Sequence, residues 1–365
     1  MAGSPPHWPN QRLLQLFGID LPIVQAPMAG ANGAAMAVAV CEAGGLGSLP
    51  CAMLSADRIR AELGDIRSRT AGPINLNFFC HAPVPVKPEV DERWRSLLAP
   101  FYAELGIEQA SPAGGVGRAP FDAAMCQLVE EERPNVVSFH FGLPAADLVD
   151  RVKRTGACVI ASATSVAEAR WLEARGCDAI IAQGSEAGGH RGIFLTDSVA
   201  SQPGTLALVP QVVDAVAVPV IAAGGIGDGR GVAAAFALGA AGVQMGTAYL
   251  LSPEATISDL HRQALRGAVD DATALTNVFT GRPARSVVNR LMREIGPISD
   301  AAPPFPGAAA ALAPLRARAE ALGKADFTSL WSGQAARLCA EEGAREITTR
   351  IAADALQWLR RLADG

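Results

Sequence analysis

The chain has 365 residues, a length that fits a (β/α)₈ barrel with additions or two ordinary domains. Its 31 Lys and Arg residues against 36 Asp and Glu residues give a net charge of −5, so we expect no electrostatic binding of nucleic acid. Hydrophobic residues make up 50% and charged residues only 18%, which excludes a disordered chain and allows a large core.

The cysteines and the first residues bear on location. The chain has seven cysteines and no CxxC pair, and residues 1–12 lack the basic and apolar regions of a signal peptide. We therefore expect free thiols in a cytoplasmic protein. The uncharged run 231–253 is built mainly of Ala and Gly, so it predicts a buried helix followed by a buried strand and no membrane span.

Short apolar or β-branched runs recur along the chain, each next to a Gly, Pro or polar break. The eight runs are 23–26, 46–49, 74–79, 136–140, 159–163, 179–183, 220–223 and 242–245. Such nearly continuous apolar segments are typical of strands buried on both faces of a parallel sheet.

Helical patterns lie between these runs, at 32–43, 165–175, 210–217 and 229–238. A repeated strand–helix order indicates an α/β fold. Eight strand candidates favour a closed (β/α)8 TIM barrel over a doubly wound sheet, and no GxGxxG follows any predicted strand.

Two segments are too long for one strand and one helix. We predict a barrel over 13–255, with an insertion at 80–133 after the third strand. Residues 256–365 are predicted to form a C-terminal helical extension that caps the barrel mouth. The alternative is that these segments only complete the outer ring of helices.

The last two strand–loop pairs predict a phosphate site. Gly224 and Gly225 follow the seventh strand, while Gly246 and Thr247 follow the eighth. In barrel folds these loops bind phosphate, because glycine lets backbone N–H groups approach the oxygens, and the threonine adds a hydroxyl donor. The alternative is that the glycines only turn the chain. The pattern indicates a phosphorylated ligand without saying which one.

The loop after the sixth strand carries His190 between glycines, which places it at the barrel mouth. Imidazole titrates near neutral pH, so His190 is our candidate general base, with an exposed loop histidine as the alternative. His140 ends the fourth strand and either contacts substrate or fills the top layer of the barrel. His7, His81 and His261 are interpreted as non-catalytic, with His261 on a surface helix.

Other polar residues have simpler interpretations. Asn77 ends the third strand and offers an amide to a ligand, or caps the strand end. Gln25 is predicted to lie inside the barrel. The acidic pairs at 131–132 and 270–271 are assigned to the surface. The sequence has no zinc-type metal spacing, no GxSxG elbow and no cysteine with an evident activating partner.

In these residues and the motifs around them, the chain resembles the FMN-dependent nitronate monooxygenases, formerly called 2-nitropropane dioxygenases. The resemblance spans nearly the whole chain, from PIVQAPMAG at 22–30 to LWSGQAA at 330–336. QGSEAGGHRG at 183–192 and QMGTAYL at 244–250 are specific together, and TGRPARSVVN at 280–289 strengthens the match. PVIAAGGI at 219–226 is shared by many phosphate barrels and carries less weight.

The resemblance implies bound FMN and two active-site histidines. His190 matches the catalytic base of the family, and His140 matches a second histidine found in many members. The implied FMN contacts are Met28, Asn77, Gln183, Gly188, Gly224, Gly225, Gln244, Met245, Gly246 and Thr247. The last part of this set would hold the phosphate.

The resemblance also implies the chemistry. An alkyl nitronate, such as propionate 3-nitronate, gives an electron to oxidised FMN, and O₂ reacts with the resulting species to yield a carbonyl compound and nitrite. With a neutral nitroalkane, His190 would first remove the α-proton. Protonated His190 or His140 could hold the anionic nitro group. No nicotinamide should be needed, and the oligomeric state stays open, with a homodimer as one candidate.

Three alternatives remain. The nearest is an FMN-dependent enoyl-acyl-carrier-protein reductase or another NAD(P)H-dependent flavin reductase. A non-redox isomerase or lyase acting on a sugar phosphate and a non-catalytic ligand sensor come from other classes. Some relatives carry tyrosines in the segment near 303–315, whereas this chain has only Tyr102 and Tyr249. The histidines must therefore supply most of the polar ring chemistry.

Overall fold

The computed structural model describes residues 8–108 and 118–364. Its main sheet contains eight parallel strands in the order β1-β9-β8-β6-β5-β4-β3-β2. They are β1 (Ile23–Gln25), β2 (Gly47–Pro50), β3 (Ile74–Phe79), β4 (Val136–His140), β5 (Cys158–Ala163), β6 (Ala179–Gln183), β8 (Val220–Ala223) and β9 (Gly242–Met245). All eight predicted strands are present, each within one residue of its predicted ends.

Backbone hydrogen bonds join the two edges of this sheet. The Gln25 amide donates to the Leu46 carbonyl and the Leu46 amide donates to the Ile23 carbonyl, both at 2.9 Å. Because β1 and β2 are the first and last strands in this order, these bonds close the sheet into the predicted (β/α)8 barrel. Gln25 is fully buried and its Oε1 accepts a 2.8 Å bond from the Ser48 amide, as expected of an interior polar residue.

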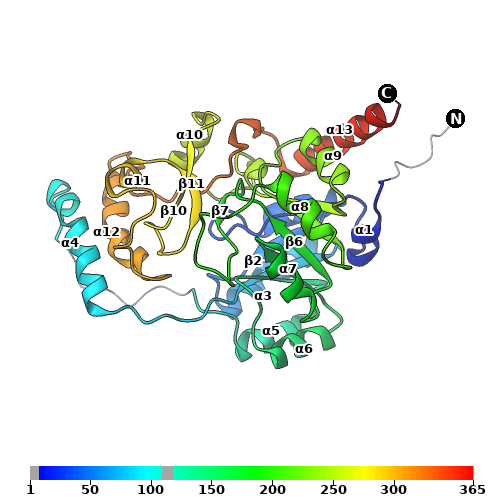
Figure 1. The fold of residues 1–365 in the computed structure, drawn as a ribbon, viewed down its shortest axis with the longest axis horizontal. Helices are drawn as coiled ribbons and strands as arrows, with labels where there is room; N and C mark the ends of the chain where they lie inside the picture. Colours follow the sequence, from blue (N-terminus) through cyan, green and yellow to red (C-terminus); the bar gives the residue numbers. More distant parts are fainter. Residues whose placement is uncertain (1–7, 109–117, 365) are drawn as a thin grey trace.

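A ring of helices covers the outside of the barrel (Figure 1). Around it lie α1 (Arg12–Phe17), α2 (Ala34–Glu42), α3 (Ala56–Arg69), α5 (Ala123–Glu132), α6 (Ala146–Arg154), α7 (Val166–Glu173), α8 (Thr205–Val213), α9 (Gly229–Ala237) and α13 (Ala344–Asp364). The run 231–253 forms most of α9 and then β9, as predicted. The described residues hold no helix long and apolar enough to cross a membrane.

The predicted start of α8 at residue 210 is wrong. The helix begins at Thr205, whose backbone amide donates to the Glu186 carboxylate at 2.8 Å. This bond satisfies one of the amides that a helix N-terminus leaves unpaired, so the helix extends back to that point. Pro210 lies inside the helix. The capping residue is 19 positions away in sequence, and a local pattern could not reveal it.

The segment between β3 and β4 lies partly against the C-terminal extension and partly against the barrel. Helix α4 (Pro88–Glu104) leaves the barrel and lies beside α12 (Ala308–Ala321) (Figure 1). The Tyr102 hydroxyl donates to the Ala311 carbonyl at 2.6 Å, and Trp94 is fully buried between these helices. Helix α5 then returns to the barrel and packs against α3 and α6. The end of the predicted insertion 80–133 therefore belongs to the ring.

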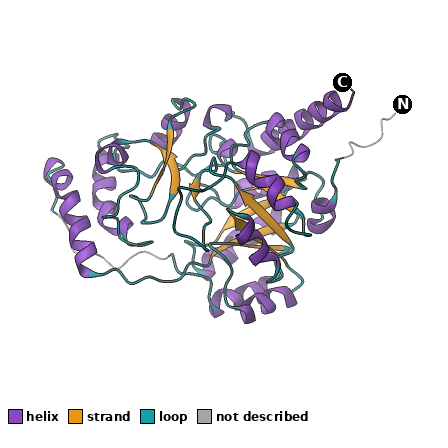
Figure 2. Ribbon diagram, viewed as in Figure 1, coloured by secondary structure: helices purple, strands orange, loops and turns teal. Residues whose placement is uncertain are grey.

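Residues after β9 form a small sheet as well as helices. Strands β10 (Thr273–Thr276) and β11 (Ala284–Val287) pair antiparallel, and β11 also pairs with β7 (Gly189–His190) (Figure 2). Helices α10 (Asp259–Arg266), α11 (Arg290–Ile295) and α12 surround this sheet. The extension predicted at 256–365 as helical thus also contains two strands, which the sequence did not indicate because β11 depends on pairing with a segment almost 100 residues away.

The last helix, α13, returns to the barrel and packs along α9 and α2 (Figure 1). Ile347, Ile351 and Ala355 are buried on this face. The alternative prediction, that the extension completes the helix ring, therefore describes α13, whereas 256–321 lies over the barrel mouth. The boundary at 255–256 between two domains stays a prediction.

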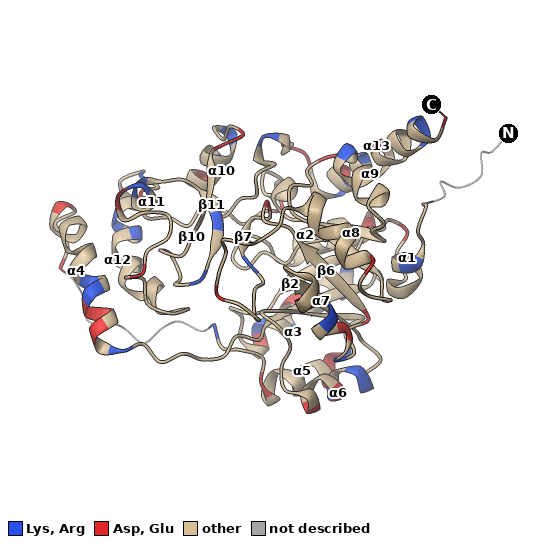
Figure 3. Ribbon diagram, viewed as in Figure 1, with Lys and Arg blue, Asp and Glu red and all other residues tan. Residues whose placement is uncertain are grey.

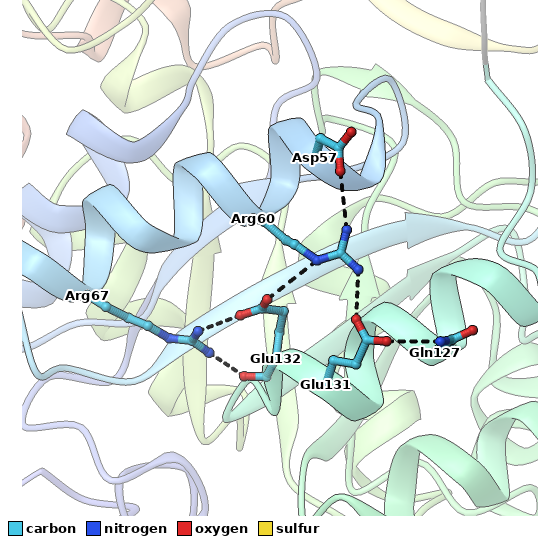
Figure 4. A network of polar contacts seen from close by, with 6 residues as sticks. All are labelled: Asp57, Arg60, Arg67, Gln127, Glu131 and Glu132. Carbon is cyan, nitrogen blue, oxygen red and sulfur yellow. Dashed lines mark hydrogen bonds and ion pairs between the residues drawn. The ribbon is translucent and has the colours of Figure 1, made fainter.

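Charged side chains lie mainly on the outer helices, and the barrel strands carry almost none (Figure 3). Glu131 and Glu132 at the end of α5 bind Arg60 and Arg67 of α3, at 2.7 and 2.6 Å (Figure 4). These partly exposed pairs link two neighbouring ring helices, which agrees with their predicted surface role. The seven cysteines are free, and the described residues hold no cluster of metal-binding side chains.

Candidate active site

A cavity of about 380 Å³ opens at the carboxyl ends of the barrel strands. This is a typical volume for a small-molecule site. Every residue proposed from the sequence lines this cavity: Met28, Asn77, His140, Gln183, Gly188, His190, Gly224, Gly225, Gln244, Met245, Gly246 and Thr247. The fold thus brings together residues from most of the chain. Their individual roles stay predictions.

His190 lies on a strand and not on the free loop that the glycines suggested. In β7 it pairs with Ala284 of β11, and its Nε2 lies 2.9 Å from the Thr280 hydroxyl. Its backbone carbonyl accepts a bond from the Gln183 amide at 3.0 Å. The backbone and one ring nitrogen of His190 are therefore fixed by the extension as well as by the barrel.

Burial keeps His190 neutral. Removal from water, together with the positive charges of Arg118 and Arg282, holds the pKa of this imidazole well below its usual range. A neutral imidazole has a free lone pair, which is the form that accepts a proton. The alternative suggested by the sequence, a protonated His190 that holds an anion, is not supported.

His140 has both ring nitrogens engaged. Nδ1 lies 3.0 Å from the Ser162 hydroxyl, and Nε2 lies 3.2 Å from the His190 carbonyl. A carbonyl only accepts, so Nε2 carries the proton and Nδ1 accepts from Ser162. Burial lowers the pKa of His140 to about 4, so this histidine is also neutral near pH 7. We therefore interpret His140 as a residue that positions β7.

These buried histidines predict a loss of stability in acid. Burial lowers the pKa of both His140 and His261 to about 4, whereas both protonate near 6.5 in the unfolded chain. Between these values the unfolded state binds more protons, so the free energy of unfolding falls as the pH drops from 6.5 to 4. We expect about 1–3 kcal/mol for each imidazole, measured by urea denaturation from pH 7 to pH 4.5.

The His140→Asn variant provides the control for this pH dependence. It should be less stable at pH 7, because Ser162 and the His190 carbonyl lose a partner, yet its stability should fall less steeply in acid. An unchanged slope would show that His140 is already protonated in the folded protein or does not titrate in this range.

The glycines that follow β8 and β9 also line the cavity. Gly224 and Gly225 have φ angles of 114° and 70°, which favour glycine over any other residue. A Cβ on Gly246 would lie 3.2 Å from the Met28 sulfur, so the backbone passes close to its neighbour there. Thr247 begins a short 3₁₀ turn, and its hydroxyl accepts a bond from the Gly333 amide. Its proton remains available to a phosphate oxygen.

Three amide side chains line the cavity and differ in what they can offer. Gln183 uses both ends of its amide on the His190 carbonyl and the Gly192 amide. Asn77 donates to Ser138. Gln244 has a buried Oε1 with no hydrogen-bond partner among the described residues. A buried acceptor of this kind is costly unless a ligand donates to it, so the cavity fits a ligand with ring N–H groups, such as a flavin.

Aromatic rings form the wall around His190, and none of them was predicted from the sequence. The ring centroids of Trp331 and Phe305 lie 5.3 and 5.4 Å from that of His190, and those of Phe141 and Phe79 lie 6.0 and 6.3 Å away. Trp331 lies in the LWSGQAA motif and Phe305 in the tyrosine-poor segment, so motif membership could have pointed to both. These rings surround the imidazole with apolar surface.

The remaining histidines are more buried than expected. His261 lies on a helix with an exposed face, as predicted, but its own side chain is only 6% exposed and its Nε2 lies 3.1 Å from the Trp331 carbonyl. The face of α10 that carries it packs against the segment of Trp331. His81 is also buried, and its ring centroid lies 4.8 Å from that of Phe305. His7 lies outside the described residues.

Comparison with known proteins defines the family. The model of the family described as "Nitronate monooxygenase" matches residues 10–354. The chain belongs to the nitronate monooxygenase family. A nitronate monooxygenase of Paraburkholderia phytofirmans is 42% identical over 355 residues, which cover 97% of each chain. One of Pseudomonas aeruginosa is 41% identical over 340 residues, covering 93% of this chain and 97% of the relative.

Solved structures agree with this assignment. A nitroalkane oxidase from Streptomyces ansochromogenes has a TM-score of 0.87 and 40% identity, covering 97% of this chain and all of the other. FabK from Thermotoga maritima has a TM-score of 0.74 and 29% identity, covering 98% and 99%. An enoyl reductase domain from Bacillus amyloliquefaciens is 13% identical and shows the fold alone. As a member of the nitronate monooxygenases, the protein is a flavin-dependent oxidoreductase.

Proposed function

We propose that this nitronate monooxygenase uses FMN and O₂ to oxidise alkyl nitronates to carbonyl compounds and nitrite. The observation that carries this proposal is a half-buried His190, whose pKa lies below its usual range, in the same cavity as the glycine-rich loops after β8 and β9. A base and a phosphate-binding end in one enclosed space suit a flavin whose ring lies beside the imidazole. Preformed nitronates and, through His190, neutral nitroalkanes are the proposed substrates.

The described residues fit FMN in two ways. Gly224, Gly225, Gly246 and Thr247 would hold the phosphate, and the unpaired Oε1 of Gln244 would accept from the flavin ring. Bound flavin supplies the electron chemistry of the reaction with the nitronate and O₂. Flavin released from the purified protein by heat should be FMN, in about equal amount to the protein. A colourless protein with no affinity for added FMN would instead favour a non-redox phosphate barrel.

The hydrogen bonds around His190 suggest which nitrogen acts as the base. The Thr280 hydroxyl lies 3.4 Å from the Arg282 carbonyl, to which it can donate. It then accepts from Nε2–H of His190 at 2.9 Å, which leaves the lone pair on Nδ1. Within the described ranges no hydrogen bond engages Nδ1. We therefore assign Nδ1 as the atom that takes the α-proton of a neutral nitroalkane.

A stopped-flow experiment separates the proposed function from a nicotinamide-dependent reductase. The holoenzyme is mixed anaerobically with propionate 3-nitronate or with NADH, and flavin absorbance is followed. We expect bleaching by the nitronate at a rate that supports turnover and essentially none by NADH. Rapid bleaching by NADH alone would favour the enoyl reductase or flavin reductase alternative.

A further inference from the structure

Glu186, in the loop after β6, is connected by hydrogen bonds to the glycine turn after β8. Both oxygens of its carboxylate accept from the backbone amide of Thr205, the first residue of α8, at 2.9 and 2.8 Å. The Thr205 hydroxyl lies 2.9 Å from a Glu186 carboxylate oxygen and 2.9 Å from the Gly224 carbonyl, and it can donate to either. These polar contacts therefore join the loop after β6, the start of α8 and the loop after β8.

Packing adds to these contacts. A Cβ on Gly225 would lie 3.2 Å from the Cβ of Glu186, and one on Gly224 would lie 2.9 Å from the Thr205 hydroxyl. Gly224 and Gly225 line the active-site cavity, whereas Glu186 and Thr205 line a second cavity that the two glycines share. Glu186 thus supports the turn from outside the active-site cavity, and it acts on a ligand there only through the turn.

The turn offers unpaired donors to the active-site cavity. Within residues 8–108 and 118–364, the backbone amides of Gly224 and Gly225 donate to no protein acceptor. Glycine amides of this kind bind phosphate oxygens. Where the two N–H groups lie depends on the φ angles of 114° and 70°, and Thr205 and Glu186 pack directly against these two residues.

The negative charge of Glu186 is offset on the protein side of the turn. Burial lowers the pKa of both Arg191 and Arg285, and the charge of Glu186 opposes this effect at each of them. Nε of Arg285 donates to the Ser185 carbonyl at 2.9 Å, one residue before Glu186. The N-terminus of α8 adds a partial positive charge. The carboxylate is therefore compatible with a phosphate on the cavity side of the turn.

We propose that Glu186 is a positioning residue of the cofactor site, which through Thr205 fixes the Gly224–Gly225 turn in the conformation that binds the flavin phosphate. This inference rests on the proposed function and adds to it a residue outside the cavity. Because Glu186 reaches the ligand only through this turn, its loss should weaken binding of the phosphate and leave the residues proposed to meet the flavin ring unchanged.

The test compares FMN with riboflavin, which lacks only the phosphate. Flavin-free protein is titrated with each, and the dissociation constants are obtained from flavin fluorescence. In Glu186→Ala the Kd of FMN should rise about 10- to 100-fold, the range for losing a hydrogen bond to a charged group, while that of riboflavin changes less than about threefold. Glu186→Gln keeps one acceptor for the Thr205 amide, so it should recover part of the preference for FMN.

Glu173→Ala is the matched control. Glu173 is also half-buried, and it accepts from the backbone amides of Ala217 at 2.6 Å and Val218 at 3.2 Å, just before the opposite end of β8. This variant should lower the melting temperature of the flavin-free protein, as Glu186→Ala does, yet keep the preference for FMN. Thr205→Val loses the hydroxyl but keeps the backbone amide, so it should lose part of the preference.

Equal losses for FMN and riboflavin in Glu186→Ala would overturn the proposal, because they would assign Glu186 to the stability of the whole site. Tighter binding of FMN would also overturn it, since the carboxylate would then only repel the phosphate. If Glu186→Ala does not fold, the same ratio in Glu186→Gln and Thr205→Val decides. A parent protein that binds neither flavin would contradict the proposed function itself, whatever the variants do.

Discussion

Replacing His190 with asparagine is expected to lower kcat/KM for neutral nitroalkanes about 10²- to 10⁴-fold, the usual contribution of a general base. The same change should affect preformed nitronates far less, since their α-proton is already gone. The measurement is oxygen uptake with each nitroalkane and its nitronate side by side. His190 suits this role because its imidazole is neutral, enclosed by aromatic rings and fixed by Thr280.

The flavin content of the variant is the control for this experiment. His190→Asn should retain FMN, because the glycine loops and Thr247, which are proposed to hold the phosphate, are unchanged. Equal losses on nitroalkanes and nitronates would remove the general-base role and leave His190 as a binding residue. A Thr280→Val variant refines the assignment: it should shift the pH profile for nitroalkanes while changing the nitronate profile little.

The second large effect concerns stability and the residue next to the base. Replacing Arg191 with methionine is expected to lower the free energy of unfolding by about 3–5 kcal/mol. Arg191 is fully buried, and its guanidinium donates to the Gln183 carbonyl at 2.7 Å, to the Gly184 carbonyl and to Gln202 Oε1 at 2.9 Å. Burial lowers the pKa of Arg191 to about 10, so it remains charged near pH 7. Methionine fills the space but leaves these buried acceptors unpaired.

Urea denaturation of the two proteins measures this effect. Arg230→Met is the matched control, because Arg230 is exposed and pairs with Asp228 at the start of α9. The Arg230 substitution should lower the free energy of unfolding only slightly, as for other surface ion pairs. If the two substitutions lower the free energy of unfolding equally, the hydrogen bonds of Arg191 do not stabilise the end of β6. Loss of these bonds should also loosen β7, so we expect the Arg191 variant to lose activity well below its unfolding midpoint.

Several parts of the site could be predicted because they depend on local sequence. The strands of the barrel are short apolar runs with clear breaks, and the active-site residues follow directly after them. In a parallel barrel all carboxyl ends meet at one face, so Asn77, His140, Gln183 and Gln244 had to converge. The same reasoning predicted a phosphate site at the glycines that follow β8 and β9.

Other features depend on contacts between distant segments. Thr280, Phe305 and Trp331 reach His190 only because β11 pairs with β7 across nearly 100 residues. Helix α4 packs on α12, more than 200 residues further along the chain. Neither contact, β7 with β11 or α4 with α12, can be recognised from the sequence of one of the two segments alone. The strand character of 189–190 and the burial of His261 were missed for the same reason.

The sequence by itself determined the α/β barrel, its strands, the family and the residues that meet at the barrel mouth. Periodic apolar runs and the motifs around His190 and Gly246 contain that information locally. The tertiary structure decided the rest: that β7 pairs with β11, that His140 contacts the His190 carbonyl, and that aromatic rings from distant segments surround His190. Charge state and hydrogen-bond partners depend on burial and on the surrounding groups, and both arise only when the distant segments pack together.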